Sequence, residues 1–176
     1  MISSKRYQVK KVYTAFTGIP AFQKIKLPTK QTGAEVSEGP PNLDVAGIIF
    51  ILNPGNSFIA GGFWGPNAED LKRIRDEIAF DASPLRKILK SKSFISTFSS
   101  LQGEQLKTSP KGFDAGNDAI DLLRFKQFLV MRKFTDGEVL SETFLKEAGK
   151  TFKNMRPFFD YMSGILSTDN NGIKIH

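Results

Sequence analysis

The stretch FIAGGFWGPNAEDLKRIRDEI, residues 58–78, places a glycine pair and a tryptophan between a strand pattern and a helix pattern. Glycines before a helix start can form a phosphate site, because the free N–H groups of the first helical turn attract an anion. The spacing matches neither G-x-x-x-x-G-K-[ST] nor G-x-G-x-x-G, so a nucleotide loop is not indicated. Two interpretations stay open for Gly61, Gly62 and Trp64: a weaker anion cradle, or a strand bend that Trp64 fills.

The turn LKTSPKGFD, residues 106–114, is a second candidate. Lys107 and Lys111 flank Pro110 and Gly112, and lysines beside turn amides suit a carboxylate or phosphate group. The alternative is a connecting loop with solvated lysines. The predicted ligand-binding residues are Gly61, Gly62, Trp64, Lys107 and Lys111. An anion at the helix start requires the two lysines to lie near it.

Metal and nucleophile chemistry is restricted by the residue types. The chain has no Cys, and its one His is the last residue, His176. Thiolate or imidazole metal sites and triads with a His base are therefore not expected, and we predict no metal and no cofactor. A carboxylate-only Mg²⁺ site is left as a formal alternative, with Asp114, Asp118 and Asp121 as its ligands. The same acids have a structural explanation, since carboxylates near a helix start stabilise its dipole.

The net charge of +7 comes entirely from the first 34 residues, which contain no acid, while the rest of the chain is balanced. A basic segment can attract nucleic acid. The residues that would make this contact are Lys5, Arg6, Lys10 and Lys11. The alternative is a solvated edge strand whose lysines prevent sheet-to-sheet association.

The length of 176 residues and the hydrophobic share of 40% are typical of one globular domain with its own core. We predict a domain over residues 1–166, of which 1–42 form a basic strand and loop region, and a flexible tail over 167–176. No secretory signal is visible, and the longest apolar run, residues 45–52, is shorter than a membrane span. We therefore expect a soluble, cytoplasmic protein with no membrane partner; the oligomeric state is not indicated.

The expected elements are a strand at 5–17, an irregular region at 18–42, and two strands at 43–52 and 57–63. The turn NPGN between the last two predicts a hairpin, since Pro54 presets φ and Gly55 accepts a positive φ. Helices are expected after Trp64, from Ser83 as an N-cap, at 92–101, at 117–126, from Thr135 as an N-cap and over 142–166, with a kink or break near Pro157. Residues 127–134 form a late strand. This order predicts an α+β fold, mostly antiparallel, with helices packed on one face of the sheet.

Three stretches together resemble a known family. They are FIAGGFWGPNAEDLKRIRDEIAFD, LKTSPKGFDAGNDAIDLLRFKQFLV and TFKNMRPFFDYM, in that order along the chain. The chain is similar over about residues 43–166 to the conserved hypothetical family called Domain of Unknown Function 2461. Family members usually begin with an Asn-Arg-x-Trp-Phe pattern and a stretch ending Lys-x-Pro-Tyr-Lys, which residues 1–42 do not reproduce. The resemblance implies that the chain is a divergent or N-terminally shortened member of this family. It implies a fold, but no activity, because no activity is established for the family.

The sequence leaves three predicted functions open. The first is a non-metal binding module for an anionic or carbohydrate-like ligand, with Trp64, Lys107 and Lys111 at its site. The alternative is nucleic-acid binding through the basic N-terminal segment. The second alternative is a carboxylate and Mg²⁺-dependent enzyme acting on phosphoesters.

Overall fold

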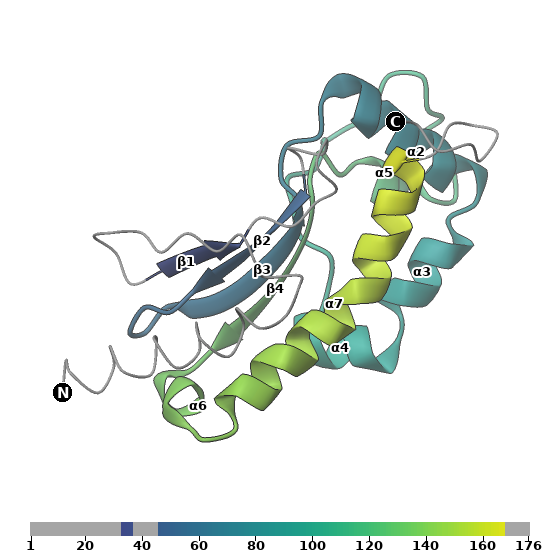
Figure 1. Ribbon diagram of the computed structural model, residues 1–176. Helices are drawn as coiled ribbons and strands as arrows, with labels where there is room; N and C mark the ends of the chain where they lie inside the picture. Colours follow the sequence, from purple (N-terminus) through teal and green to yellow (C-terminus); the bar gives the residue numbers. More distant parts are fainter. Residues whose placement is uncertain (1–32, 37–45, 168–176) are drawn as a thin grey trace. The chain divides into compact units, whose positions relative to one another are not determined.

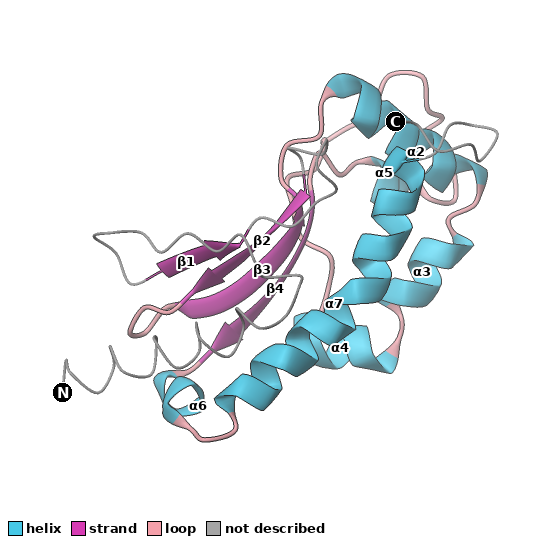
Figure 2. Cartoon of the chain, in the orientation of Figure 1, coloured by secondary structure: helices cyan, strands magenta, loops and turns pink. Residues whose placement is uncertain are grey.

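The computed structural model of the chain describes residues 33–36 and 46–167 (Figure 1). In this part of the chain the sheet has the strand order β1-β2-β3-β4. The strands are β1 (Gly33–Val36), β2 (Ala46–Ile51), β3 (Ser57–Phe63) and β4 (Phe128–Phe134). The helices are α2 (Ala68–Phe80), α3 (Ser83–Leu89), α4 (Lys92–Phe98), α5 (Ile120–Leu123), α6 (Asp136–Leu140) and α7 (Phe144–Ser167). Figure 2 shows the strands and helices in separate colours, and the α+β prediction is confirmed.

The described residues belong to two compact units. The first unit is built from residues up to Gly61 and residues 131–153, and the second from residues 62–130 and from Asn154 onward. Strands β3 and β4 and helix α7 have residues in both. The single-domain prediction for residues 1–166 stays a prediction.

The first unit contains the predicted hairpin. Asn56 N–H donates to the carbonyl of Asn53 at 2.8 Å, and Gly55 has a φ of 73°. The Gly55 N–H also donates to Asp136 Oδ1 at 2.8 Å, which ties the turn to α6. On the sheet, the ring of Phe144 from α7 packs against Phe50 and Phe134, with centroids 6.2 and 5.3 Å away. This unit therefore places α7 on one face of its sheet.

The second unit has an aromatic and aliphatic core. Phe63 at the end of β3 contacts the rings of Phe158 and Phe159 in α7. Ile74 and Ile78 are the fully buried residues of α2, four positions apart on one face of that helix. The α2 side chain of Arg73 donates to the carbonyls of Ile165 and Leu166 at the end of α7. The helices of this unit are thus fixed by both apolar burial and hydrogen bonds to helix-end carbonyls.

Capping residues define several helix starts. Thr135 forms a capping box with Glu138 at the start of α6, as its sequence position predicts. Ser91 caps α4, so the predicted helix at 92–101 is confirmed but ends at Phe98. The N-cap of α3 is Ala82 and Ser83 is its first residue, so the N-cap role predicted for Ser83 is wrong and the helix starts one residue earlier than predicted.

Other sequence predictions need correction. Residues 33–36 lie in the region expected to be irregular, yet they form β1, paired antiparallel with β2 from Gly33 opposite Ile51 to Val36 opposite Ile48. The helix expected at 117–126 is limited to Ile120–Leu123. The predicted break at Pro157 is wrong, since α7 continues to Ser167, whereas the alternative of a kink there stays a prediction. The strand predicted at 5–17 and the tail from 168 lie outside the described residues.

Candidate functional site

Gly62 is required by a close approach of two strands. Its φ is 142°, and a Cβ built on it would lie 2.1 Å from the carbonyl oxygen of Phe128 in β4. A side chain at this position is excluded by backbone atoms that cannot rotate away. The structure therefore supports the strand-bend interpretation of the glycine pair. Gly61 is buried in β3 and belongs to the first unit, whereas Gly62 begins the second.

Trp64 follows this bend and is only partly buried. Its indole N–H is nonetheless enclosed, and no acceptor for it is present among the described residues. An indole nitrogen can only donate, and a buried donor without an acceptor costs about 1–3 kcal/mol. An oxygen from an ordered water or from a ligand would satisfy this donor.

The start of α2 does not favour an anion. Asn67 is the N-cap, and its Oδ1 accepts the backbone N–H of Asp70 at 2.8 Å. Glu69 and Asp70 add two carboxylates to the first turn. The side chains at this helix start thus already supply the negative charge that a bound phosphate would bring. The N-cap and the two carboxylates therefore disfavour an anion-binding site at the start of α2.

The turn of residues 107–112, which we call the lysine turn, has a defined backbone. Pro110 is buried, the Phe113 N–H donates to the Pro110 carbonyl at 3.1 Å, and Gly112 has a φ of 87°. Lys107 and Lys111 are both exposed. Within the described residues neither lysine forms an ion pair, whereas Lys126 beyond the turn is paired with Glu104 at 3.1 Å. The lysine turn therefore presents two uncompensated positive charges from a fixed scaffold.

The five predicted residues fall into two places. Gly61, Gly62 and Trp64 lie along one bend, and Lys107 and Lys111 lie on one turn. Among the described residues, no hydrogen bond, ion pair or ring contact connects Trp64 with either lysine. The cationic and the aromatic parts of the predicted site therefore do not contact each other directly among the described residues of the second unit.

The three aspartates of the Mg²⁺ alternative are exposed, and the carboxylates of Asp114 and Asp121 have other partners. Asp114 Oδ1 accepts the Gly116 N–H at 2.9 Å. Arg86 pairs with the Asp121 carboxylate at 2.6 Å and also donates to the backbone carbonyl of Asp118. Within the described residues, no three His, Cys, Asp or Glu side chains come together as a metal site.

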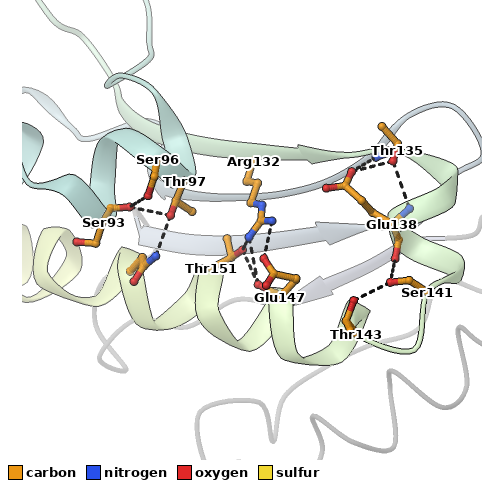
Figure 3. Close-up of polar contacts among 11 residues, drawn as sticks. Ser93, Ser96, Thr97, Arg132, Thr135, Glu138, Ser141, Thr143, Glu147 and Thr151 are labelled. Atoms are coloured by element: carbon orange, nitrogen blue, oxygen red, sulfur yellow. Dashed lines mark hydrogen bonds and ion pairs between the residues drawn. The ribbon is translucent and has the colours of Figure 1, made fainter.

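Two polar features have no signal in the sequence. In the first unit, Arg132 of β4 donates to the Glu147 carboxylate at 2.8 Å and to Thr151 Oγ1 at 2.9 Å (Figure 3). The guanidinium of Arg132 also lies 4.7 Å from the ring centre of Phe134. The hydrogen bond from Arg132 lowers the pKa of Glu147. This network holds α7 to β4, and its charges compensate each other, so we assign it to stability.

The second feature is Tyr161 in α7. Its hydroxyl is buried and has no hydrogen-bond partner among the described residues. Burial, together with the negative charges of Glu77 and Asp81, raises the pKa of Tyr161 to about 12. Both carboxylates come from α2 and its C-cap, so the packing of α2 and α7 in this unit brings their negative charges into the environment of the phenol.

The basic residues proposed for nucleic acid, Lys5, Arg6, Lys10 and Lys11, lie outside the described residues. In the part of the chain that is described, no helix combines the length and apolar character needed to cross a bilayer.

Comparison with known proteins gives one match. The model of the family described as "Conserved hypothetical protein (DUF2461)" matches residues 21–161. The match begins earlier than the resemblance noted in the sequence and includes part of the segment that departs from the family pattern. No curated protein and no solved structure matches the chain.

Proposed function

We propose, on the premise that the chain belongs to the conserved hypothetical protein family DUF2461, that it is a binding module without a metal for an anionic or carbohydrate-like ligand. The observation that carries the proposal is the lysine turn, where Lys107 and Lys111 have no acidic partner among the described residues. A phosphate or carboxylate group of the ligand binds there by charge-assisted hydrogen bonds.

The role of Trp64 in this proposal is different. The acids and the N-cap at the start of α2 disfavour an anion beside it, so Trp64 contacts an uncharged part of the ligand. The indole of Trp64 is partly exposed and offers an apolar face to a ligand, while its N–H is enclosed. A sugar phosphate contains both required parts, an anionic group for the lysines and a sugar ring that can pack on the exposed face of the indole.

The experiment uses the fluorescence of the protein itself, because Trp64 is its one tryptophan. Glucose 6-phosphate, inorganic phosphate and glucose are titrated separately. We expect saturable binding of glucose 6-phosphate with a change in Trp64 emission, weakened by added salt. Phosphate alone should bind through the lysine turn with a smaller emission change.

The control variants separate the two contacts. Lys107→Gln combined with Lys111→Gln should weaken glucose 6-phosphate binding by about tenfold, which is about 1.4 kcal/mol. Lys90→Gln removes one charge from another exposed lysine that has no ion pair among the described residues, and should leave binding unchanged. Equal affinity of the double variant and the unaltered protein, measured by calorimetry, would remove the lysine turn from the proposal.

The other two functions stay predictions. Nucleic-acid binding depends on residues outside the described part of the chain, and it predicts an affinity that falls steeply with salt. The phosphoester enzyme gains no support, since Asp121 is held by Arg86. The cytoplasmic location and the absence of a membrane partner also stay predictions.

A further inference from the structure

The end of α2 carries an exposed aromatic ring. Phe80 is the last residue of this helix, and 87% of its surface is accessible. The other large hydrophobic residues exposed in the described part of the chain are Ile95 at 52% and Leu140 at 47%. Both faces of the Phe80 ring are therefore open to a partner.

The surroundings of Phe80 are negative. Its helix ends without a basic residue in the last turn, so the partial negative charge of the terminal carbonyls is not offset there. Glu77 precedes Phe80 by three positions and lies on the same side of the helix. Asp81 follows directly, and hydrogen bonds from Ser83 lower the pKa of Asp81, which keeps it ionised at neutral pH. Both carboxylates are exposed.

Two of the neighbouring positive charges are already engaged, whereas Lys87 in α3 and Lys90 at its C-cap are exposed and have no ion pair among the described residues. Lys72 forms its ion pair with Asp76, at 2.6 Å, one turn before Phe80. Arg86 in α3 is paired with Asp121 at 2.6 Å. Across the described part of the chain, no ion pair compensates Glu77 or Asp81.

We propose that Glu77, Phe80 and Asp81, which we call the Phe80 surface, bind an arginine-containing basic segment of a partner protein. A guanidinium over the face of Phe80 gains cation–π attraction, and the flanking carboxylates accept its N–H groups. Arginine fits better than lysine because its planar group stacks on a ring and is less strongly hydrated. The carboxylates repel a nucleic acid, so charge complementarity selects a basic peptide. This surface is independent of the lysine turn.

The test uses labelled hexa-arginine, hexa-lysine and hexa-glutamate peptides, with binding followed by fluorescence anisotropy. The net charge of the protein is +7, so charge as a whole opposes binding of hexa-arginine and favours hexa-glutamate. We expect hexa-arginine to bind more tightly than hexa-lysine. Phe80→Ala should weaken hexa-arginine by about fivefold, and Glu77→Gln should weaken both cationic peptides.

Leu140→Ala is the matched control, because it also truncates an exposed hydrophobic side chain. It should leave hexa-arginine binding unchanged. Phe80 is exposed, so its truncation does not disturb the core, and thermal unfolding of the variant verifies this. Absence of hexa-arginine binding overturns the proposal. An affinity that is equal in the unaltered protein and in Phe80→Ala overturns it as well.

Discussion

The replacement of Gly62 by alanine tests the explanation of the glycine pair. The new Cβ would lie 2.1 Å from the Phe128 carbonyl oxygen, whereas real Cβ atoms essentially never come closer than 3.0 Å to such an atom. Strands β3 and β4 would have to separate locally by about 0.9 Å, the difference between these distances. The positive φ adds strain of about 1–3 kcal/mol, and each ladder hydrogen bond lost adds about 1 kcal/mol.

The expected loss in the free energy of unfolding for Gly62→Ala is therefore about 3–5 kcal/mol. For a chain of this size, that lowers the midpoint of thermal unfolding by about 6–20 °C. Calorimetry or circular dichroism during heating gives this value. Urea unfolding gives a second, independent value.

Two glycines of the same chain serve as controls. Gly55 has a φ of 73°, but a Cβ added to it would have nothing within 4 Å, so Gly55→Ala measures the cost of positive φ alone, about 1 kcal/mol. Gly65 has neither constraint, so Gly65→Ala should be close to neutral. We predict that the loss of stability falls in the order Gly62, Gly55, Gly65. If Gly62→Ala unfolded at the same temperature as Gly65→Ala, the close approach of β3 and β4 would be wrong.

Three further predictions concern other positions. Ser99 has a φ of 64° and a ψ of −57°, in a turn closed by a hydrogen bond from the Ser100 N–H to the Phe98 carbonyl at 2.7 Å. This backbone conformation is strained for a residue with a side chain, so Ser99→Gly should raise the free energy of unfolding by about 1 kcal/mol in urea titrations. A lower free energy of unfolding in the variant would contradict the strain at Ser99. The hydrogen bonds from Thr135 lower the pKa of Glu138 in the folded protein below its value in the unfolded chain. The ionised Glu138 therefore stabilises the fold above its unfolded pKa, and this stabilisation is lost as the pH falls through the folded pKa. Thr135→Ala should cost about 1 kcal/mol at neutral pH and less in acid; an equal cost at both would argue against the capping box. The pKa of Tyr161 is raised to about 12 from 10.0, so the protein should lose stability as the pH rises from 10 to 12 because the unfolded phenol ionises first. Tyr161→Phe should reduce this alkaline loss and remove one phenolate absorbance step near pH 12, and an unchanged titration would refute it.

Local signals in the sequence predict the features that depend on neighbouring residues. The NPGN turn is recognisable because Pro54 and Gly55 have specific φ preferences, and both residues lie in the hairpin turn. The N-cap Thr135 is recognisable because its hydroxyl accepts from an amide three positions away. Such features need no knowledge of the tertiary structure.

Features that depend on distant partners are missed or only partly predicted by the sequence. Strand β1 has no strong pattern of its own and is defined by pairing with β2. The close approach that requires Gly62 comes from β4, far along the chain. The helix continues through Pro157 because buried residues on both sides of it, Met155 and Phe158, keep α7 packed. Local sequence preferences are overridden where tertiary packing stabilises another conformation by more than the local preference costs.

The candidate site shows the same division. Pro110 and Gly112 are local signals, and they predict the lysine turn. The start of α2 disfavours an anion because Asn67 caps the helix and Glu69 and Asp70 add negative charge to its first turn. The sequence does not predict this, because it does not show which residue is the N-cap. The Phe80 surface has no sequence signal, because an apolar residue at a helix end is usually expected to be buried.

The most direct measurement of the proposed binding function is titration of the unaltered protein with glucose 6-phosphate, followed by the emission of Trp64, its one tryptophan. We predict a saturable emission change that salt weakens, and an affinity that the combined Lys107→Gln and Lys111→Gln variant reduces about tenfold. If neither glucose 6-phosphate nor inorganic phosphate binds at millimolar concentration, as measured by emission and by calorimetry, the proposed binding function of the lysine turn is contradicted.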